Sequence, residues 1–325
     1  MSTLHITNGD HAGDMLRRFV DGPVTLACDM LHEGPCPPVD GDAWHKVRGR
    51  FLAGRGRPAD EITASLAAGD RTILDACNRG ERLVLWFEHD LFDQLALIRT
   101  LDLVGRVRSD PTSISLICID RFPGVDRFVG LGQLTPDQLA TLTGTGVPMT
   151  AGQVGLARDA WRAFRSADPS ELVRIAPSSS ALPFLGDALL RFAAEYPSVD
   201  NGLSRTEELA LGALDGGPMS GGALFGDTQR REPVPFMGDW PFFDTLQRLA
   251  SARVPLVTVE TGSDGGEMRS ARLALTAAGR DVLARKADHV RLNGNDLWRG
   301  GVHLTGSDHS PWRWDGDAER LVSLT

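Results

Sequence analysis

Lysine and cysteine are both scarce in this chain of 325 residues. Only two lysines, Lys46 and Lys286, occur among the 34 basic residues, a bias more typical of a GC-rich coding sequence than of a particular function. The cysteines show no C-x-x-C spacing and lie in or beside apolar segments: Cys28, Cys36, Cys77 and Cys118. We therefore expect reduced core residues rather than disulfides or metal ligands.

Long apolar runs and an excess of positive charge are missing as well. No apolar run approaches the roughly 20 residues of a membrane span, and the chain begins directly in a strand pattern, so we expect a soluble cytoplasmic protein. The net charge of −9 disfavours a surface that gathers nucleic acid, although a local basic patch stays open. A small molecule is the expected partner.

Familiar nucleotide, nucleophile and metal motifs are absent from the sequence. It contains neither G-x-G-x-x-G nor G-x-x-x-x-G-K-[ST], so neither a dinucleotide nor a nucleoside triphosphate is expected. It has no G-x-S-x-G motif for a serine nucleophile. Histidines and carboxylates could bind zinc, manganese or iron, but no H-x-H, H-x-x-x-H or H-E-x-x-H spacing occurs. We therefore expect no cofactor and no metal.

Strands and helices alternate in the first part of the chain. Apolar strand patterns occur at 4–7, 23–28, 83–87 and 113–119, with helical patterns between them. A parallel sheet with right-handed crossovers is the economical topology for this alternation. We predict an α/β fold with a Rossmann-like domain at residues 1–130.

The rest of the chain divides into three predicted parts: a helical connecting region at 131–200, a winged-helix-like unit at 201–288 and a β-rich closing tail at 289–325. The winged-helix prediction rests on the order of helices before a hairpin. Residues 200–290 contain ten Arg and Lys against thirteen Asp and Glu, a net charge of −3 (10 − 13). Since phosphate neutralisation supplies most of the affinity for DNA, this balance favours a protein-interaction or structural role.

The central motif is the segment 83–97, in which Glu88, His89 and Asp90 follow an apolar strand and open a helix. Side chains at i and i+2 of a strand share a face, so Glu88 and Asp90 point the same way and His89 the other, unless the strand has already ended. Carboxylates raise the pKa of a neighbouring histidine and of each other. Such a cluster holds protons near neutral pH, as general acid/base catalysis requires. The alternative is that these residues cap a helix or brace a loop.

Other polar residues follow the neighbouring strands, and the carboxyl ends of parallel strands share one edge of a sheet. The His32-Glu33 pair repeats the His/carboxylate combination, and Asn8-Gly9 could bind an anion or a hydroxyl through backbone N–H groups. The candidate catalytic residues are Asp10, His32, Glu33, Glu88, His89 and Asp90. The candidate substrate-binding residues are Asn8, Gly9, Asp29, Arg48, Asp93 and Gln94. Arginines at 48, 50, 55 and 57 form either an anion clamp or a solvated face.

Several of these segments resemble the bacterial family catalogued as domain of unknown function 1835. Residues 4–10, 29–35 and 85–94 are similar to its signatures, and residues 201–207 and 296–301 to its usual C-terminal continuation. Gly69-Asp70 departs from the usual Arg-Asp of the family, which removes one guanidinium. In general character the chain also resembles the larger subunit of actinobacterial enzymes that close aziridine rings by expelling sulfate. That resemblance implies a small second subunit, no metal and no redox cofactor.

These observations lead to one leading functional hypothesis and one rival. The leading hypothesis is an enzyme of specialised metabolism, such as antibiotic biosynthesis, that acts on a small, polar, amino-acid-like metabolite. Asp10, Glu33, Glu88 and Asp90 would orient or deprotonate an amine, His32 or His89 would shuttle a proton, and an arginine would hold an anionic group. For an intramolecular displacement, positioning could supply most of the rate. The rival is a ligand-sensing transcriptional regulator or a protein-interaction module. A homo-oligomer is the alternative to a small partner subunit.

Overall fold

The computed structural model describes residues 2–53, 56–260, 267–306 and 312–324. It is a mixed α/β protein in which the chain forms two compact units. The N-terminal unit comprises Met1–Leu189 and Gly300–Val302, and the C-terminal unit comprises Leu190–Arg299 and His303–Thr325. The boundary between them falls within helix α8 (Leu185–Ala193).

The N-terminal unit is built on a five-stranded sheet with the order β2-β1-β3-β4-β5. Its strands are β1 (Thr3–Thr7), β2 (Val24–Leu26), β3 (Arg82–Glu88), β4 (Ile114–Ile119) and β5 (Val147–Pro148). The first four are parallel, as predicted, whereas β5 pairs antiparallel with β4 and was not predicted. The central strands are β1 and β3, whose buried residues include Leu4, Ile6, Leu83, Leu85 and Phe87.

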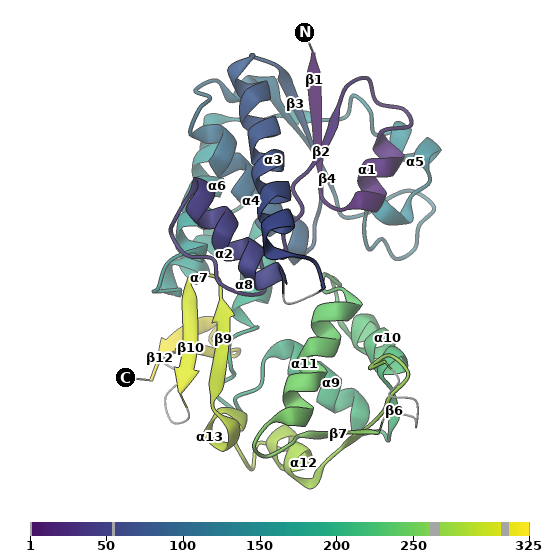
Figure 1. The fold of residues 1–325 in the computed structure, drawn as a ribbon, viewed down its shortest axis with the longest axis vertical. Helices are drawn as coiled ribbons and strands as arrows, with labels where there is room; N and C mark the ends of the chain where they lie inside the picture. Colours follow the sequence, from purple (N-terminus) through teal and green to yellow (C-terminus); the bar gives the residue numbers. More distant parts are fainter. Residues whose placement is uncertain (1, 54–55, 261–266, 307–311, 325) are drawn as a thin grey trace. The chain divides into compact units, whose positions relative to one another are not determined.

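Helices cover both faces of this sheet. Figure 1 shows α1 (Asp10–Leu16) and α5 (Pro136–Ala140) on one side, and α3 (Ala59–Asn78) and α4 (Leu91–Gly105) on the other. The remaining helices of this unit are α2 (Gly41–Ala53), α6 (Ala151–Phe164) and α7 (Ser170–Ile175), with short 3-10 turns at Pro111–Ser113, Leu131–Gln133 and Ala176–Ser178. The chain order reverses between β1 and β3, and in open α/β sheets ligands bind beyond the carboxyl ends of the strands at such a reversal.

The segment between β4 and α5 packs against the sheet. Phe128, Leu131 and Leu134 join a buried cluster with Trp86 of β3 and Met15 of α1. This apolar anchoring brings the backbone of the segment to the end of β3. Three helices of the chain begin with capping boxes, at Thr135, Thr150 and Ser204.

The C-terminal unit contains a three-stranded antiparallel sheet with the order β6-β8-β7. Its elements, in chain order, are α9 (Arg205–Leu214), β6 (Met219–Ser220), α10 (Gly221–Arg231), α11 (Asp239–Ser251), β7 (Val257–Glu260), β8 (Arg272–Leu275) and α12 (Ala277–Leu283). The tail consists of α13 (His289–Asn293) and two two-stranded sheets, β9 (Asn295–Arg299) with β10 (Val302–Gly306) and β11 (Trp312–Asp315) with β12 (Arg320–Ser323).

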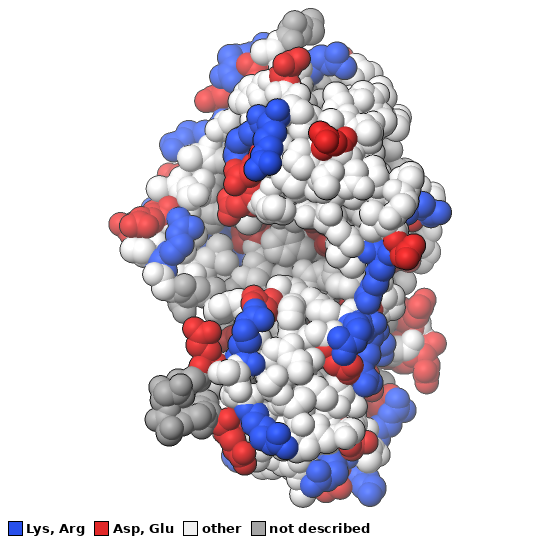
Figure 2. Space-filling view, turned by 90° about the vertical axis from the view of Figure 1, so that its right-hand side faces the viewer, with Lys and Arg blue, Asp and Glu red and all other residues white. Residues whose placement is uncertain are grey.

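Charged side chains are distributed without a dominant patch on the face drawn in Figure 2, where acidic and basic groups are interspersed. Many of the basic groups are arginines paired with a carboxylate a turn away on the same helix, such as Arg162 with Asp159 and Arg230 with Asp227. Among the described residues, no helix has the length and apolar character needed to cross a membrane.

Candidate functional site

Three carboxyl groups meet at the carboxyl end of β3. Glu88 is the last residue of β3, Asp90 is the N-cap of α4, and Asp93 lies in the first turn of that helix. Each offers an oxygen atom, and these atoms lie within 4.8 Å of one another. We call Glu88, Asp90 and Asp93 the carboxyl cluster. The strand ends and the helix begins within three residues, so side chains that would alternate along a longer strand converge here.

Each carboxylate of the cluster accepts a defined hydrogen bond. Asp90 Oδ1 accepts from the backbone N–H of Asp93 at 3.0 Å, and Asp93 Oδ1 accepts from the backbone N–H of Glu88 at 3.0 Å. The Asn8 amide donates to Asp93, which joins the end of β1 to the cluster. Glu88 Oε1 accepts from the backbone N–H of Leu131 at 2.5 Å, so the segment that follows β4 closes over Glu88.

Burial and mutual repulsion raise the proton affinity of this cluster. The pKa of Glu88 rises to about 8, because the carboxyl group is buried and the charge of Asp90 is close. Burial raises the pKa of Asp90 to about 6. Burial, followed by the charges of Asp90 and Glu88, puts the pKa of Asp93 well above its ordinary value. Near neutral pH the cluster therefore retains protons and can both donate and accept them.

The same spacing is compatible with a cation. Among the described residues, the carboxyl cluster is the set of acidic or imidazole groups whose atoms one hard divalent cation could contact together. Bound protons explain the close approach of the three carboxyl groups equally well, because each proton neutralises one of the like negative charges.

The protons of the cluster should make the stability of the protein depend on pH. Folded Glu88 has a pKa of about 8 against an ordinary 4.5, so the unfolded chain releases this proton first as the pH rises. The free energy of unfolding should thus fall between about pH 5 and pH 8, by about 1.4 kcal/mol per pH unit for one retained proton. Urea denaturation followed by tryptophan fluorescence at several pH values measures this slope.

Two variants isolate the contribution of Glu88 to that slope. Glu88→Gln should flatten the fall above pH 5, whereas Glu61→Gln, at an exposed glutamate of α3, should reproduce the wild-type slope. Comparing the variants with the wild type also cancels the contributions of His5 and His89 to the slope. Burial lowers the pKa values of these histidines, so their contributions have the sign opposite to that of Glu88. An unchanged slope in Glu88→Gln would show that Glu88 holds no extra proton.

His89 does not join the carboxyl cluster. Its ring lies 6.0 Å from the ring of Phe128 and 6.0 Å from that of Phe184, and its buried Nδ1 has no hydrogen-bond partner in the described parts of the chain. The expectation that neighbouring carboxylates raise its pKa is wrong. Burial lowers the pKa of His89, and this effect exceeds the opposing attraction of Asp120. His89 therefore does not share protons with Glu88 and Asp90.

Asp29 and Arg48 form a buried ion pair rather than an open substrate clamp. The side chain of Arg48 is 0% exposed, and its Nη2 lies 2.7 Å from Asp29 Oδ1. The guanidinium also donates to the carbonyl oxygens of Met30, Glu33 and Pro35, at 2.8, 2.9 and 3.1 Å. The sequence predicts both side chains as substrate-binding residues. In the structure, Arg48 holds the loop that follows β2, and Asp29 both pairs with Arg48 and lines a cavity described below.

The other predicted residues divide between this loop, the carboxyl cluster and a nearby cavity. His32 and Glu33 are buried in the loop, with the ring of His32 5.6 Å from that of Phe92. Gln94 donates to the backbone oxygen of Glu88 at 2.6 Å and so supports the cluster. Gly9 has a φ of 72° at the turn into α1, a conformation that favours glycine. The predicted acidic and imidazole groups therefore do not all share one cavity.

A cavity of about 170 Å³ lies at the carboxyl end of β2, lined in part by Asp10, Cys28, Arg57 and Arg99. It is close to the carboxyl cluster. Cys28 is exposed at this cavity, so the expectation that it is a core residue is wrong. Desolvation of its thiol, followed by the charges of Asp29, Asp10 and Asp93, raises the pKa of Cys28 to about 11. We call this the polar cavity. Of the four arginines considered together in the sequence, Arg48 is buried, Arg50 is exposed, Arg57 lines the polar cavity and residue 55 lies outside the described residues.

Sequence reasoning missed three residues beside the polar cavity. Asp70 accepts two hydrogen bonds from Arg99, at 3.0 and 2.7 Å, and lies 2.8 Å from His45 Nε2. The sequence gives a partial indication for Arg99. It follows Asp93 and Ala96 at intervals of three residues, and positions at this spacing lie on the same face of a helix. No signal in the sequence pairs Asp70 with either partner.

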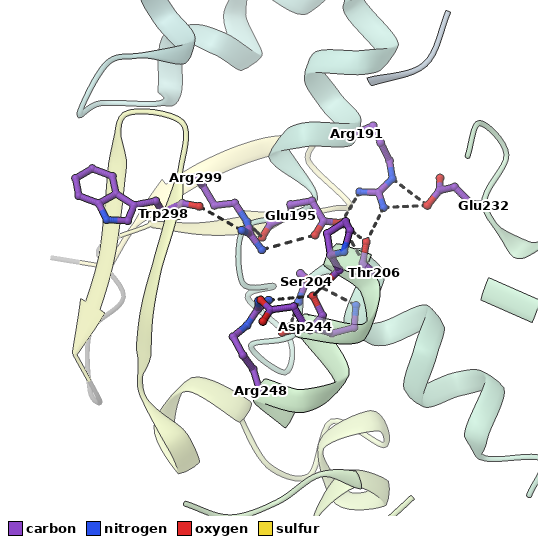
Figure 3. Close-up of polar contacts among 12 residues, drawn as sticks. Arg191, Glu195, Ser204, Thr206, Glu232, Asp244, Arg248, Trp298 and Arg299 are labelled. Atoms are coloured by element: carbon purple, nitrogen blue, oxygen red, sulfur yellow. Dashed lines mark hydrogen bonds and ion pairs between the residues drawn. The ribbon is translucent and has the colours of Figure 1, made fainter. Parts of the chain in front are cut away.

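The C-terminal unit contains a second group of buried charges, drawn in Figure 3. Arg191 contacts Glu195 at 2.7 Å and Glu232 at 2.9 Å, and Thr206 donates to Glu195 at 2.6 Å. The side chains of Arg191, Glu195 and Glu232 are 15%, 3% and 7% exposed. Opposite charges compensate each other within this group, as expected for a network that holds α8 to its neighbours.

Comparison with known proteins adds no family to this description. No protein-family model matches the sequence, and no curated protein matches it. The chemistry of the carboxyl cluster and the polar cavity must therefore be argued from their own atoms.

Proposed function

We propose that the protein is an enzyme that carries out acid/base chemistry on a small amino-acid-like metabolite. The observation that supports the proposal is the carboxyl cluster, in which Glu88, Asp90 and Asp93 lie within 4.8 Å at the point where the order of the parallel strands reverses. A carboxyl group with a pKa of about 8, such as that of Glu88, is matched to proton transfer near neutral pH.

The reaction favoured by the resemblance to aziridine-forming enzymes is an intramolecular displacement. A carboxylate of the cluster accepts a proton from the substrate ammonium, and the freed nitrogen lone pair attacks the carbon that carries a sulfate ester. The carbon–oxygen bond breaks, and sulfate leaves with the electron pair. This reaction needs no oxidant, so alignment and one base are the contributions required of the protein.

An assay for released sulfate tests this proposal. We expect the purified protein to release sulfate from amino acids that carry a sulfate ester on the carbon next to the amine-bearing carbon, as measured by ion chromatography. The control substrate is the same ester with its amine acetylated, which cannot supply the lone pair and should release none. Release no faster than in buffer alone, across a series of such esters, would refute the displacement. Repeating the assay with EDTA and then with Mg²⁺ shows whether a cation replaces the protons of the cluster.

The resemblance to the family of domain of unknown function 1835, and to enzymes with a small second subunit, extends this proposal. We propose a cytoplasmic biosynthetic enzyme that works with a small partner subunit or as a homo-oligomer. Size-exclusion chromatography with light scattering distinguishes a monomer from a homo-oligomer, and co-expression with neighbouring genes tests for the partner.

A transcriptional regulator is the second candidate, supported by the element order of the C-terminal unit. The succession of α9, β6, α10, α11 and the β7–β8 pair is the order of a winged helix, in which α11 would enter the major groove. However, Arg248 of α11 is paired with Asp244 of the same helix at 2.7 Å, which leaves less positive charge for phosphate. A gel-shift assay on the adjacent promoter should show no binding that weakens steeply with salt; such binding would favour the regulator.

A further inference from the structure

We propose that the polar cavity and an adjoining apolar cavity together bind a small zwitterion with an apolar tail, whose charged head lies between Asp10 and Arg57. The second cavity, of about 340 Å³, is lined by Met30, Leu52, Ile62 and Phe92 among others. The two cavities share part of their lining, including Cys28, Arg57 and Leu66, and therefore adjoin each other. This inference goes beyond the proposed function: it assigns a binding site for a zwitterion and does not place that ligand against the carboxyl cluster, whose members line neither cavity.

Two opposite charges on the wall of the polar cavity have no partner among the described residues. Asp10 and Arg57 are both exposed, and within the described parts of the chain neither makes a hydrogen bond or an ion pair. Other exposed arginines, such as Arg50 and Arg71, also lack a carboxylate partner among the described residues, but Arg57 shares the wall of one cavity with an unpaired aspartate. A ligand that carries both a cation and an anion would satisfy both side chains.

A third charged residue is fixed in place before any ligand arrives. Asp70 holds the guanidinium of Arg99 through two hydrogen bonds, and His45 Nε2 contacts Asp70 Oδ2, one of the two oxygens that accept them. A guanidinium held by two bonds has little rotamer freedom left to lose, so its remaining N–H groups can bind an anion at low entropic cost. Arg99 and Arg57 thus form the anion side of the polar cavity, and Asp10 forms its cation side.

The size and chemistry of the two cavities define the shape of the ligand. The polar cavity, of about 170 Å³, has room for several water molecules and so for the charged head of an amino acid. The apolar cavity is larger, and apart from Cys28, Asp29, Arg57 and Ser65, which it shares with the polar cavity, its lining is aliphatic and aromatic. Asp29 is already paired with Arg48. The tail of the ligand is therefore apolar, rather than polar throughout as the sequence led us to expect.

Calorimetric titration of the full chain at pH 7 with four probes tests this inference. Norleucine has both charges and a butyl tail; norleucinamide lacks the anion, hexanoate lacks the cation, and glycine lacks the tail. We expect norleucine to bind most tightly, with each lost charge weakening binding about tenfold and the lost tail weakening it about a hundredfold. No heat from norleucine at about 20 mM would overturn the inference.

Two exposed substitutions should give a crossed pattern that a general loss of folding cannot produce. Arg57→Gln should weaken norleucine and hexanoate about tenfold and leave norleucinamide unchanged, whereas Asp10→Asn should weaken norleucine and norleucinamide and spare hexanoate. Arg71→Gln, at an exposed arginine of α3 that lines neither cavity, should change nothing. Equal effects on all probes, or none, would contradict the assignment of the charges.

One more variant separates this inference from the proposed function. Glu88→Gln should bind norleucine within about twofold of the wild type, because Glu88 lines neither cavity. If the crossed pattern holds while no sulfate is released from any ester, the zwitterion site stands and the displacement falls. If sulfate is released but the charge variants behave like wild type, the substrate lies elsewhere and the zwitterion site falls.

Discussion

Replacing Glu88 with glutamine is expected to lower the rate of sulfate release by about 10²- to 10⁴-fold, the usual contribution of a positioned general base. Glutamine has nearly the same shape, and its oxygen can still accept the hydrogen bond from Leu131 N–H that closes the segment over β3. The variant should therefore fold normally and lose only the proton acceptor. A rate within threefold of the wild type would remove Glu88 from the reaction.

The pH dependence of the rate tells a base from a structural residue. The wild-type rate should rise with pH up to about 8, where Glu88 becomes ionised. In Asp90→Asn the neighbouring negative charge is lost, so the pKa of Glu88 falls and the rising limb of the profile should move to lower pH. A residue that only braces the loop would change the rate at every pH by the same factor. Initial rates across pH 5 to 9 distinguish the two.

Replacing Arg48 with methionine is expected to lower the free energy of unfolding by about 3 to 5 kcal/mol, the usual effect of breaking a buried ion pair on one side. The substitution removes the partner of Asp29, which is 5% exposed, and leaves three carbonyl oxygens of the following loop without this donor. Because Cys28, Asp29 and Met30 also line the two cavities, probe binding should weaken as the loop loosens. Urea denaturation and calorimetry measure the two effects.

A control and a double variant make the ion-pair prediction specific. Arg50→Met, at an exposed position of the same helix, should change the free energy of unfolding by less than about 0.5 kcal/mol. Asp29→Leu combined with Arg48→Met removes both charges and should recover part of the loss, because no buried carboxylate is left unpaired. A loss below about 1 kcal/mol in Arg48→Met would mean that the loop does not depend on this pair.

The carboxyl cluster was largely predictable because its members are close in sequence. The end of β3 and the start of α4 lie within three residues, so local geometry alone brings Glu88, Asp90 and Asp93 together. Asn8 followed from the parallel alternation, since neighbouring parallel strands end at the same edge. His89 was misjudged for the opposite reason. Its pKa depends on Phe128 and Phe184, which are distant in sequence and whose packing against its ring was not predictable.

By itself, the sequence determined the four parallel strands of the sheet, the helices between them, and the carboxylates at the end of β3. These depend on hydrogen bonds and side-chain spacing over a few residues. Only the tertiary structure decided that Arg48 holds Asp29, that Asp70 holds Arg99, and that Asp10 and Arg57, without partners among the described residues, line one cavity. The physical reason is that a charge binds whichever opposite charge the packing of the helices brings within about 4 Å, and that choice is made by the fold rather than by neighbours along the chain.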